Sequence, residues 1–211
     1  MKSSSVTFLT KGHQLVKLPI TLTVGRLFIS PLFLLTYLYY DKVGVSLTIL
    51  PYILLALLSL SEGSDFFDGY LARKLRCVTD LGKILDPMAD SIVHLAVILT
   101  FTRGISDLPI WLALIFLYRD ILIGALRTLC AFKGVVLAAR KSGKIKTALV
   151  GTSLFVILAL MIPYTMGMLS LDRFQLYAQA LMGLCAVYTL FSGTEYIYVN
   201  RAYIKQAFYS K

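Results

Sequence analysis

The sequence predicts an all-α integral membrane protein with six transmembrane helices and an N-terminal amphipathic helix at the membrane interface. Apolar residues make up 58% of the 211 residues, only 15% are charged, and the mean hydropathy is +0.77. Several apolar runs approach the ~20 residues that a helix needs to cross a hydrocarbon core about 30 Å thick. The alternating strands of a membrane barrel are absent from the sequence, so a helical bundle remains as the spanning architecture.

The elements follow one another without a linker or an internal repeat, so residues 1–211 are predicted to form a single membrane domain. In residues 1–19, apolar side chains such as Val6 and Phe8 alternate with basic and polar ones, which is typical of a helix lying in the interface. No apolar core followed by a cleavage site precedes the first span, so no removable signal is expected. The predicted spans are roughly Ile20 to Tyr40, Val45 to Leu60, Ile84 to Phe101, Pro109 to Phe132, Thr147 to Met168 and Phe174 to Phe191.

Basic residues gather on one side of these spans. The net charge of +10 would suggest nucleic acid as a partner of a soluble protein, but here Lys and Arg mark the cytoplasmic side of a membrane. This predicts a multi-pass protein of the cell (inner) membrane, with both termini and the segment between the second and third spans in the cytoplasm, and no nucleic-acid partner. Fifteen of the 21 basic residues lie in alternate connections, namely Lys2, Lys11, Lys17, Arg73, Lys74, Arg76, Lys83, Lys133, Arg140, Lys141, Lys144, Lys146, Arg201, Lys205 and Lys211.

Two pairs of aspartates flank the junction between the second and third spans. Asp65 and Asp68 are three residues apart and Asp86 and Asp90 are four apart, so each pair projects from one face of a helix. A turn through residues 75–81 allows the two helices to run antiparallel, which brings the four carboxylates together near the cytoplasmic interface. Four uncompensated carboxylates repel one another, and oxygen donors without His or Cys favour Mg²⁺ or Mn²⁺ as the compensating cation.

Residues around the aspartates suit a phosphate ligand. Arg73 offers a guanidinium fork, and Gly69 and Ala72 are small residues on or beside the aspartate face that leave room for a bulky group. Asp80 does not fall on this face and is predicted to be a solvated loop residue. His94, one turn beyond the last aspartate, is predicted to be a hydrogen-bonded interior residue rather than a metal ligand or base. The alternative that aspartates only cap helices or pair with nearby cations explains one of them better than four at helical spacing.

The aspartate segment resembles the signature of the CDP-alcohol phosphatidyltransferases. It reads D-G-x2-A-R-x8-G-x3-D-x3-D from Asp68 to Asp90 and is preceded by Asp65, while Ile20 and Ser91 depart from the residues that many members carry outside the signature. The resemblance implies a homodimer with a two-metal site, in which Asp90 also acts as the general base. The implied metal ligands are Asp65, Asp68, Asp86 and Asp90, and the implied contacts to CDP-diacylglycerol are Gly69, Ala72, Arg73 and Thr79.

The fourth span contains a second charged motif, YRDILIGALR. Arg119 and Arg127 are eight residues apart, so two helical turns return them to nearly one face, where they either pair with Asp120 or meet an anionic substrate. A predicted loop at Ser142 to Thr147, SGKIKT, adds two lysines, which also fit ordinary flanking of a cytoplasmic boundary. R-[DE]-x6-R followed by G-K-x-K-T resembles the phosphatidylglycerolphosphate synthases of this family. The implied contacts to an acceptor phosphate are Arg119, Arg127 and Lys144.

The predicted reaction is transfer of the phosphatidyl group from CDP-diacylglycerol to glycerol 3-phosphate, with release of CMP. The same chemistry with serine, inositol phosphate or inositol as the acceptor is an alternative. A polyprenyl transferase generally carries its two acidic motifs far apart on a longer chain, whereas here they lie within 26 residues. A cation-coupled transporter is the remaining alternative, and it does not require the small residues and Arg73 at fixed spacing.

Overall fold

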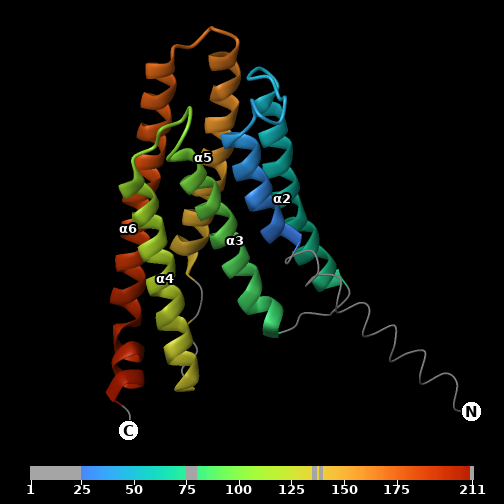
Figure 1. Cartoon of the computed structure of the whole chain (residues 1–211). Helices are drawn as coiled ribbons and strands as arrows, with labels where there is room; N and C mark the ends of the chain where they lie inside the picture. Colours follow the sequence, from blue (N-terminus) through green and yellow to red (C-terminus); the bar gives the residue numbers. More distant parts are fainter. Residues whose placement is uncertain (1–24, 75–79, 135–136, 138–139, 210–211) are drawn as a thin grey trace, which may run out of the picture. The chain divides into compact units, whose positions relative to one another are not determined.

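The computed structural model is all-α, as predicted (Figure 1). It describes residues 25–74, 80–134, 137 and 140–209, and their side chains except those of 65–87 and 207–209. The predicted interfacial helix at residues 1–19 and most of the predicted turn therefore lie outside the described residues. The helices in the described part are Gly25–Leu38, α2 (Leu50–Lys74), α3 (Asp80–Phe101), α4 (Ile110–Phe132), α5 (Lys141–Thr165) and α6 (Leu171–Tyr209).

Two sequence predictions about loops are wrong. Asp80 is the first residue of α3 and not a loop residue, and Ser142 to Thr147 belong to the first turns of α5. In both cases the helix begins before the apolar run that the sequence shows. Hydropathy marks where a chain enters the hydrocarbon core, whereas a helix continues into polar residues as long as its backbone hydrogen bonds are made.

The chain divides into two compact units, Met1–Val97 and Ile98–Lys211. In the first unit, α2 buries Leu50, Leu54 and Leu58, whose four-residue spacing marks one face of the helix. On α3, Val93 is buried in the same unit. The faces of α2 and α3 that carry functional candidates are thus continuations of buried apolar faces.

In the second unit, α6 packs against both α4 and α5 (Figure 1). The rings of Tyr164 and Phe174 stack with centroids 5.4 Å apart where α5 leads into α6. The other face of α6 exposes apolar side chains such as Leu184, which is 71% exposed and suits contact with lipid. Buried residues of α6 recur mostly every three or four positions, and they include Phe174, Ala178, Met182, Cys185, Thr189, Ser192, Tyr196 and Asn200.

Two described helices are long and apolar enough to span a membrane, Lys141–Thr165 and Leu171–Gln206. Apolar stretches of the other helices, such as Gly25–Leu38, are shorter, and α4 carries three charged side chains among its 23 residues. α6 has 39 residues and is therefore about 58 Å long, nearly twice the thickness of a hydrocarbon core. The predicted span from Phe174 to Phe191 covers less than half of this helix.

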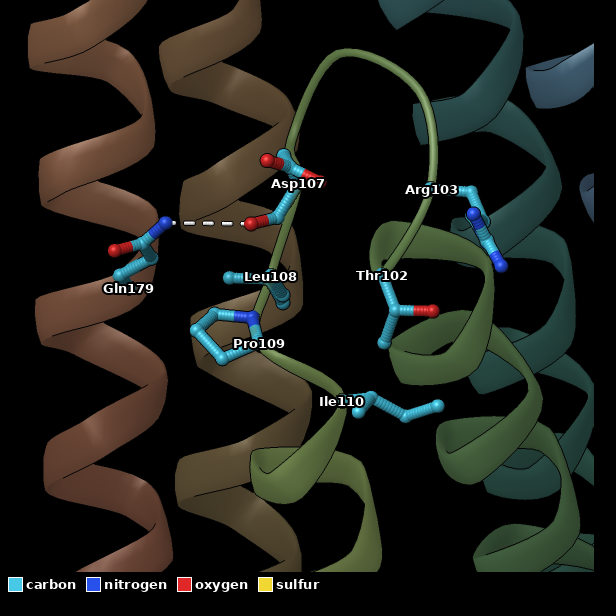
Figure 2. A pocket seen from close by; sticks show the side chains of 7 residues that line it. All are labelled: Thr102, Arg103, Asp107, Leu108, Pro109, Ile110 and Gln179. Atoms are coloured by element: carbon cyan, nitrogen blue, oxygen red, sulfur yellow. Dashed lines mark hydrogen bonds between the residues drawn. The ribbon is translucent and has the colours of Figure 1, made fainter.

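The connection between α3 and α4 is hydrogen-bonded to α6. Gln175 Nε2 donates a hydrogen bond to the carbonyl of Ile105 at 3.0 Å, and Gln179 Nε2 donates to that of Asp107 at 3.2 Å (Figure 2). A pocket of about 390 Å³ lies beside this connection. It is lined by Thr102, Arg103, Asp107, Leu108, Pro109, Ile110 and Gln179 (Figure 2).

Two glycines of the second unit provide a test of this backbone. Gly167, after α5, has φ +74°, a conformation that costs an L-residue ~1 kcal/mol or more, whereas Gly183 lies within α6 with nothing within 4 Å of an added Cβ. Gly167→Ala should lower the free energy of unfolding by about 1 kcal/mol, and Gly183→Ala should leave it unchanged or raise it by up to ~1 kcal/mol. Thermal unfolding of both variants in detergent measures the difference, and equal shifts would contradict the assigned turn.

Candidate active site

The four predicted metal-binding aspartates lie on two helices, as expected. Asp65 and Asp68 are in α2, and Asp86 and Asp90 are in α3. Of these side chains, the structure describes that of Asp90. The other predicted contacts to CDP-diacylglycerol, namely Gly69, Ala72, Arg73 and Thr79, have side chains outside the described part of the chain.

A hydrogen bond one turn away shows how α2 and α3 face each other. His94 Nε2 lies 2.9 Å from Glu62 Oε1. Glu62 precedes Asp65 by three residues, and His94 follows Asp90 by four, so each shares a helix face with an aspartate. The faces of α2 and α3 that carry aspartates therefore oppose each other at this level. The prediction that His94 is a hydrogen-bonded interior residue is confirmed.

Asp90 is held by a residue of a third helix. Arg26, in the helix Gly25–Leu38, is only 3% exposed, and its Nη1 donates to Asp90 Oδ1 at 2.7 Å. The ion pair orients the carboxylate and places positive charge beside the predicted metal site. No role was predicted for Arg26, although a cation inside an apolar run is costly and therefore indicates an acidic partner.

In the second unit, a carboxylate of α4 joins two cations. Lys146 Nζ lies 2.8 and 3.0 Å from the two carboxylate oxygens of Asp120, and Arg119 Nη1 lies 2.9 Å from Asp120 Oδ1. Lys146 is 4% exposed, whereas the side chain of Lys144 is exposed near the start of α5. Of the two alternatives for Arg119, the structure shows the pairing with Asp120. The lysine that pairs with Asp120 is Lys146, which was grouped with Lys144 in the predicted loop but not named as a contact to the acceptor phosphate.

Both arginines of α4 also contact α6. Arg119 Nη2 donates to Ser192 Oγ at 3.0 Å, and Arg127 Nε donates to Tyr196 Oη at 3.1 Å. A Cβ at Gly193 would lie 3.2 Å from Cγ of Arg119, so this glycine leaves room for the arginine stem. The predicted placement of the two arginines on one face of α4 is thus confirmed. Their partners were missed because they follow the last predicted span.

The charges of this cluster are unbalanced. Arg119 and Arg127 on α4 and Lys144 and Lys146 on α5 are four cations, whereas Asp120 is one carboxylate and pairs with two of them. Glu195 is paired with Arg140 at 3.1 Å. An excess of positive charge between helices suits an anion such as a phosphate group. We call Arg119, Arg127, Lys144 and Lys146 the cationic cluster, within which Asp120 pairs with Arg119 and Lys146.

Comparison with known families concerns both the aspartates of α2 and α3 and the cationic cluster. Residues 16–191 match the family of CDP-alcohol phosphatidyltransferases. The chain belongs to this family. The matched CDP-alcohol phosphatidyltransferase region includes every site residue predicted from the sequence, and it ends just before Ser192.

Curated relatives have one name in common. A protein of Bacillus subtilis (strain 168) is 34% identical over 137 residues, which cover 62% of this chain and 70% of the relative. A protein of Rickettsia typhi (strain ATCC VR-144 / Wilmington) is 27% identical over 189 residues, covering 88% of this chain and 98% of the relative. Both are named CDP-diacylglycerol--glycerol-3-phosphate 3-phosphatidyltransferase.

The family match confirms the resemblance found in the signature. This CDP-alcohol phosphatidyltransferase is an enzyme of phospholipid biosynthesis and belongs to a membrane family whose members typically use a divalent metal. The match sets aside the polyprenyl transferase and the cation-coupled transporter. It leaves the roles of individual residues to be inferred from the geometry.

The Asp120 cluster leads to a prediction about stability. Asp120→Asn leaves Arg119 and Lys146 without their shared carboxylate, so it should lower the free energy of unfolding by about 3 kcal/mol. Adding Lys146→Met to Asp120→Asn should recover part of this loss, because one uncompensated buried cation is removed. A double-mutant cycle measured by unfolding in detergent reports the coupling, and strictly additive effects would show that the ion pair does not stabilise the fold.

Proposed function

We propose that this CDP-alcohol phosphatidyltransferase transfers the phosphatidyl group of CDP-diacylglycerol to glycerol 3-phosphate and releases CMP. The observation that carries the proposal is the match to relatives named for this reaction, one of which covers 88% of the chain. The cationic cluster supports the same acceptor, because serine and inositol have no phosphate for it to bind. Inositol phosphate also carries a phosphate, so the cationic cluster alone does not distinguish it from glycerol 3-phosphate as the acceptor.

The aspartates of α2 and α3 are proposed to hold two divalent ions, Mg²⁺ or Mn²⁺. The donor set fits, since all four candidates offer hard carboxylate oxygens, and Glu62 and His94 bring the two helix faces together one turn away. Bound metal would supply charge neutralisation to the pyrophosphate. The proposed ligands are Asp65, Asp68, Asp86 and Asp90, and the proposed contacts to CDP-diacylglycerol are Gly69, Ala72, Arg73 and Thr79.

Asp90 is proposed to act as the general base. It accepts the proton of the primary hydroxyl of glycerol 3-phosphate, and the hydroxyl oxygen forms a bond to the β-phosphorus of CDP-diacylglycerol. The bond from that phosphorus to the bridging oxygen breaks, and CMP leaves with the electron pair. Arg26 restrains the base from a third helix, so the carboxylate does not have to be ordered when the substrates bind.

The cationic cluster is proposed to bind the phosphate of the acceptor. Arg119 and Arg127 provide the planar forks, and Lys144 provides an exposed third charge at the start of α5. Asp120, which is itself paired with Lys146, holds Arg119 in place, while Ser192 and Tyr196 are proposed to orient the two arginines from α6. Because phosphate is close to dianionic at neutral pH, it would offset the excess charge of the cluster.

The chain is proposed to span the inner membrane six times as a homodimer, with both termini and the active site in the cytoplasm. The alternation of basic residues supports this topology. The exposed apolar side chains of α6 support contact with lipid. CDP-diacylglycerol would then enter the site laterally from the bilayer.

The acceptor can be identified directly. Purified protein in detergent with CDP-diacylglycerol and Mg²⁺ or Mn²⁺ should release CMP with glycerol 3-phosphate, and not with serine, inositol or inositol phosphate. Asp90→Asn serves as the inactive control, because an amide oxygen can keep the contact to Arg26 but cannot take the proton. Release with another acceptor alone would replace the proposed substrate, and full activity of Asp90→Asn would exclude it as the base.

Binding of the acceptor should depend on the hydroxyl of Tyr196. Tyr196→Phe keeps the ring, whose centroid lies 5.1 Å from the guanidinium carbon of Arg127, and removes the hydrogen bond. We expect KM for glycerol 3-phosphate to rise about 3- to 10-fold, the value of one hydrogen bond, with little change in KM for CDP-diacylglycerol. Tyr198→Phe is the matched control, since Tyr198 is exposed on the same helix. An unchanged KM in Tyr196→Phe would remove α6 from the acceptor site.

A further inference from the structure

Glu62 and His94 form a polar contact that the proposed reaction does not use. His94 is 4% exposed and lies in α3, and the side chain of Glu62 in α2 is 38% exposed. An ionised carboxylate only accepts hydrogen bonds, so His94 Nε2 donates to Glu62 Oε1. Polar groups between apolar helices are costly, and an apolar pair of similar volume would often stabilise the fold as well or better. The contact therefore needs an explanation other than stability.

The position of Glu62 and His94 along the two helices explains their contact. Along α2, Glu62 is about 4.5 Å from the level of Asp65, and along α3, His94 is about 6 Å from the level of Asp90, at 1.5 Å per residue. The contact between Glu62 and His94 is a directional hydrogen bond between α2 and α3 at this level. The pair thus links α2 and α3 directionally about one helical turn from each aspartate pair.

Metal coordination demands an accurate separation of these helices. Mg²⁺ requires oxygen ligands at about 2.0–2.1 Å in nearly ideal octahedral geometry, whereas a shift of one residue along a helix moves a side chain by ~1.5 Å. Burial of apolar side chains such as Leu58 and Val93 stabilises helix packing but is non-directional, so it tolerates small axial displacements. A hydrogen bond at 2.9 Å does not tolerate them.

We propose that Glu62 and His94 are a positioning pair, whose contact fixes the axial register of α2 against α3 and thereby sets the separation of the two aspartate pairs. The inference rests on the proposed metal site. It adds two residues that do not touch metal or substrate and whose contribution is made through the aspartates. Metal affinity, more than folding, should therefore depend on the pair.

The test measures Mn²⁺ affinity by electron paramagnetic resonance of the free ion, with the full-length protein in detergent. His94→Leu should weaken Mn²⁺ binding about 10- to 100-fold, the range seen when residues that support metal ligands are changed. Glu62→Gln, which keeps an acceptor oxygen, should bind within about threefold of the wild type, a change below ~0.7 kcal/mol. The exchanged variant, Glu62→His with His94→Glu, should restore most of the affinity that His94→Leu loses.

Arg140→Leu is the matched control. It removes the contact of Arg140 with Glu195, which also joins two segments of the fold but lies in the second unit. Arg140→Leu should lower the unfolding temperature and leave Mn²⁺ affinity unchanged. If His94→Leu does not fold, the exchanged variant and Glu62→Ala still decide the question.

The outcomes separate the two proposals. Wild-type affinity in folded His94→Leu, or an exchanged variant that folds but binds no better than His94→Leu, overturns the positioning role. A wild-type protein that binds no Mn²⁺ overturns the proposed metal site itself. Loss of affinity in Arg140→Leu equal to that in His94→Leu would show a general effect of destabilisation, which also contradicts the inference.

Discussion

The organisation of this chain depends on compensating carboxylates that are placed among apolar helices. A carboxylate in such surroundings is costly unless a cation or several hydrogen bonds accompany it. The acidic side chains described within the helices follow this constraint, and Asp172 lies in the first turn of α6, where the helix dipole favours it. The pairs are Glu62 with His94, Asp90 with Arg26, Asp120 with Arg119 and Lys146, and Glu195 with Arg140.

The same constraint connects the proposed metal site with the proposed anion site. In the first unit, several carboxylates lie on α2 and α3, and Arg26 is a described cation beside them. In the proposed function, divalent metal compensates the remaining negative charge. In the second unit, cations outnumber carboxylates, and the acceptor phosphate would supply the missing negative charge. In the proposed function, bound metal and the acceptor phosphate thus each complete a charge balance that the protein leaves open, which ties binding to electrostatic stabilisation of the transferred group.

The sequence predicted features that depend on local spacing. The start of α4 follows from Pro109, which has no backbone N–H to donate a helical hydrogen bond and therefore favours a helix start. The end of α4 follows from Gly134, whose φ of +75° is not helical. The placement of the aspartates on helix faces follows from separations of three and four residues. The end of α6 could not be predicted in this way, because hydropathy falls after Phe191 while the backbone hydrogen bonds continue.

Contacts between residues far apart in the chain could not be predicted from the sequence. Arg26 and Asp90 are 64 positions apart, and Arg127 and Tyr196 are 69 apart, so neither pairing has a local pattern. What the sequence did provide was the cost of a buried charge, which requires a partner without naming it. A rule that searches for the partner of each buried charge would have pointed to acidic residues for Arg26, and would not have found a tyrosine hydroxyl.

The central claim is that opposed faces of α2 and α3 hold two divalent ions. Counting the Mn²⁺ bound at equilibrium by the wild-type protein with CDP-diacylglycerol tests it most directly. Two ions per chain, with an electron paramagnetic resonance spectrum broadened by coupling between them, are predicted at the ~3.5–4 Å separation of two-metal sites. A single uncoupled ion per chain, or no bound ion, would contradict this account of the site.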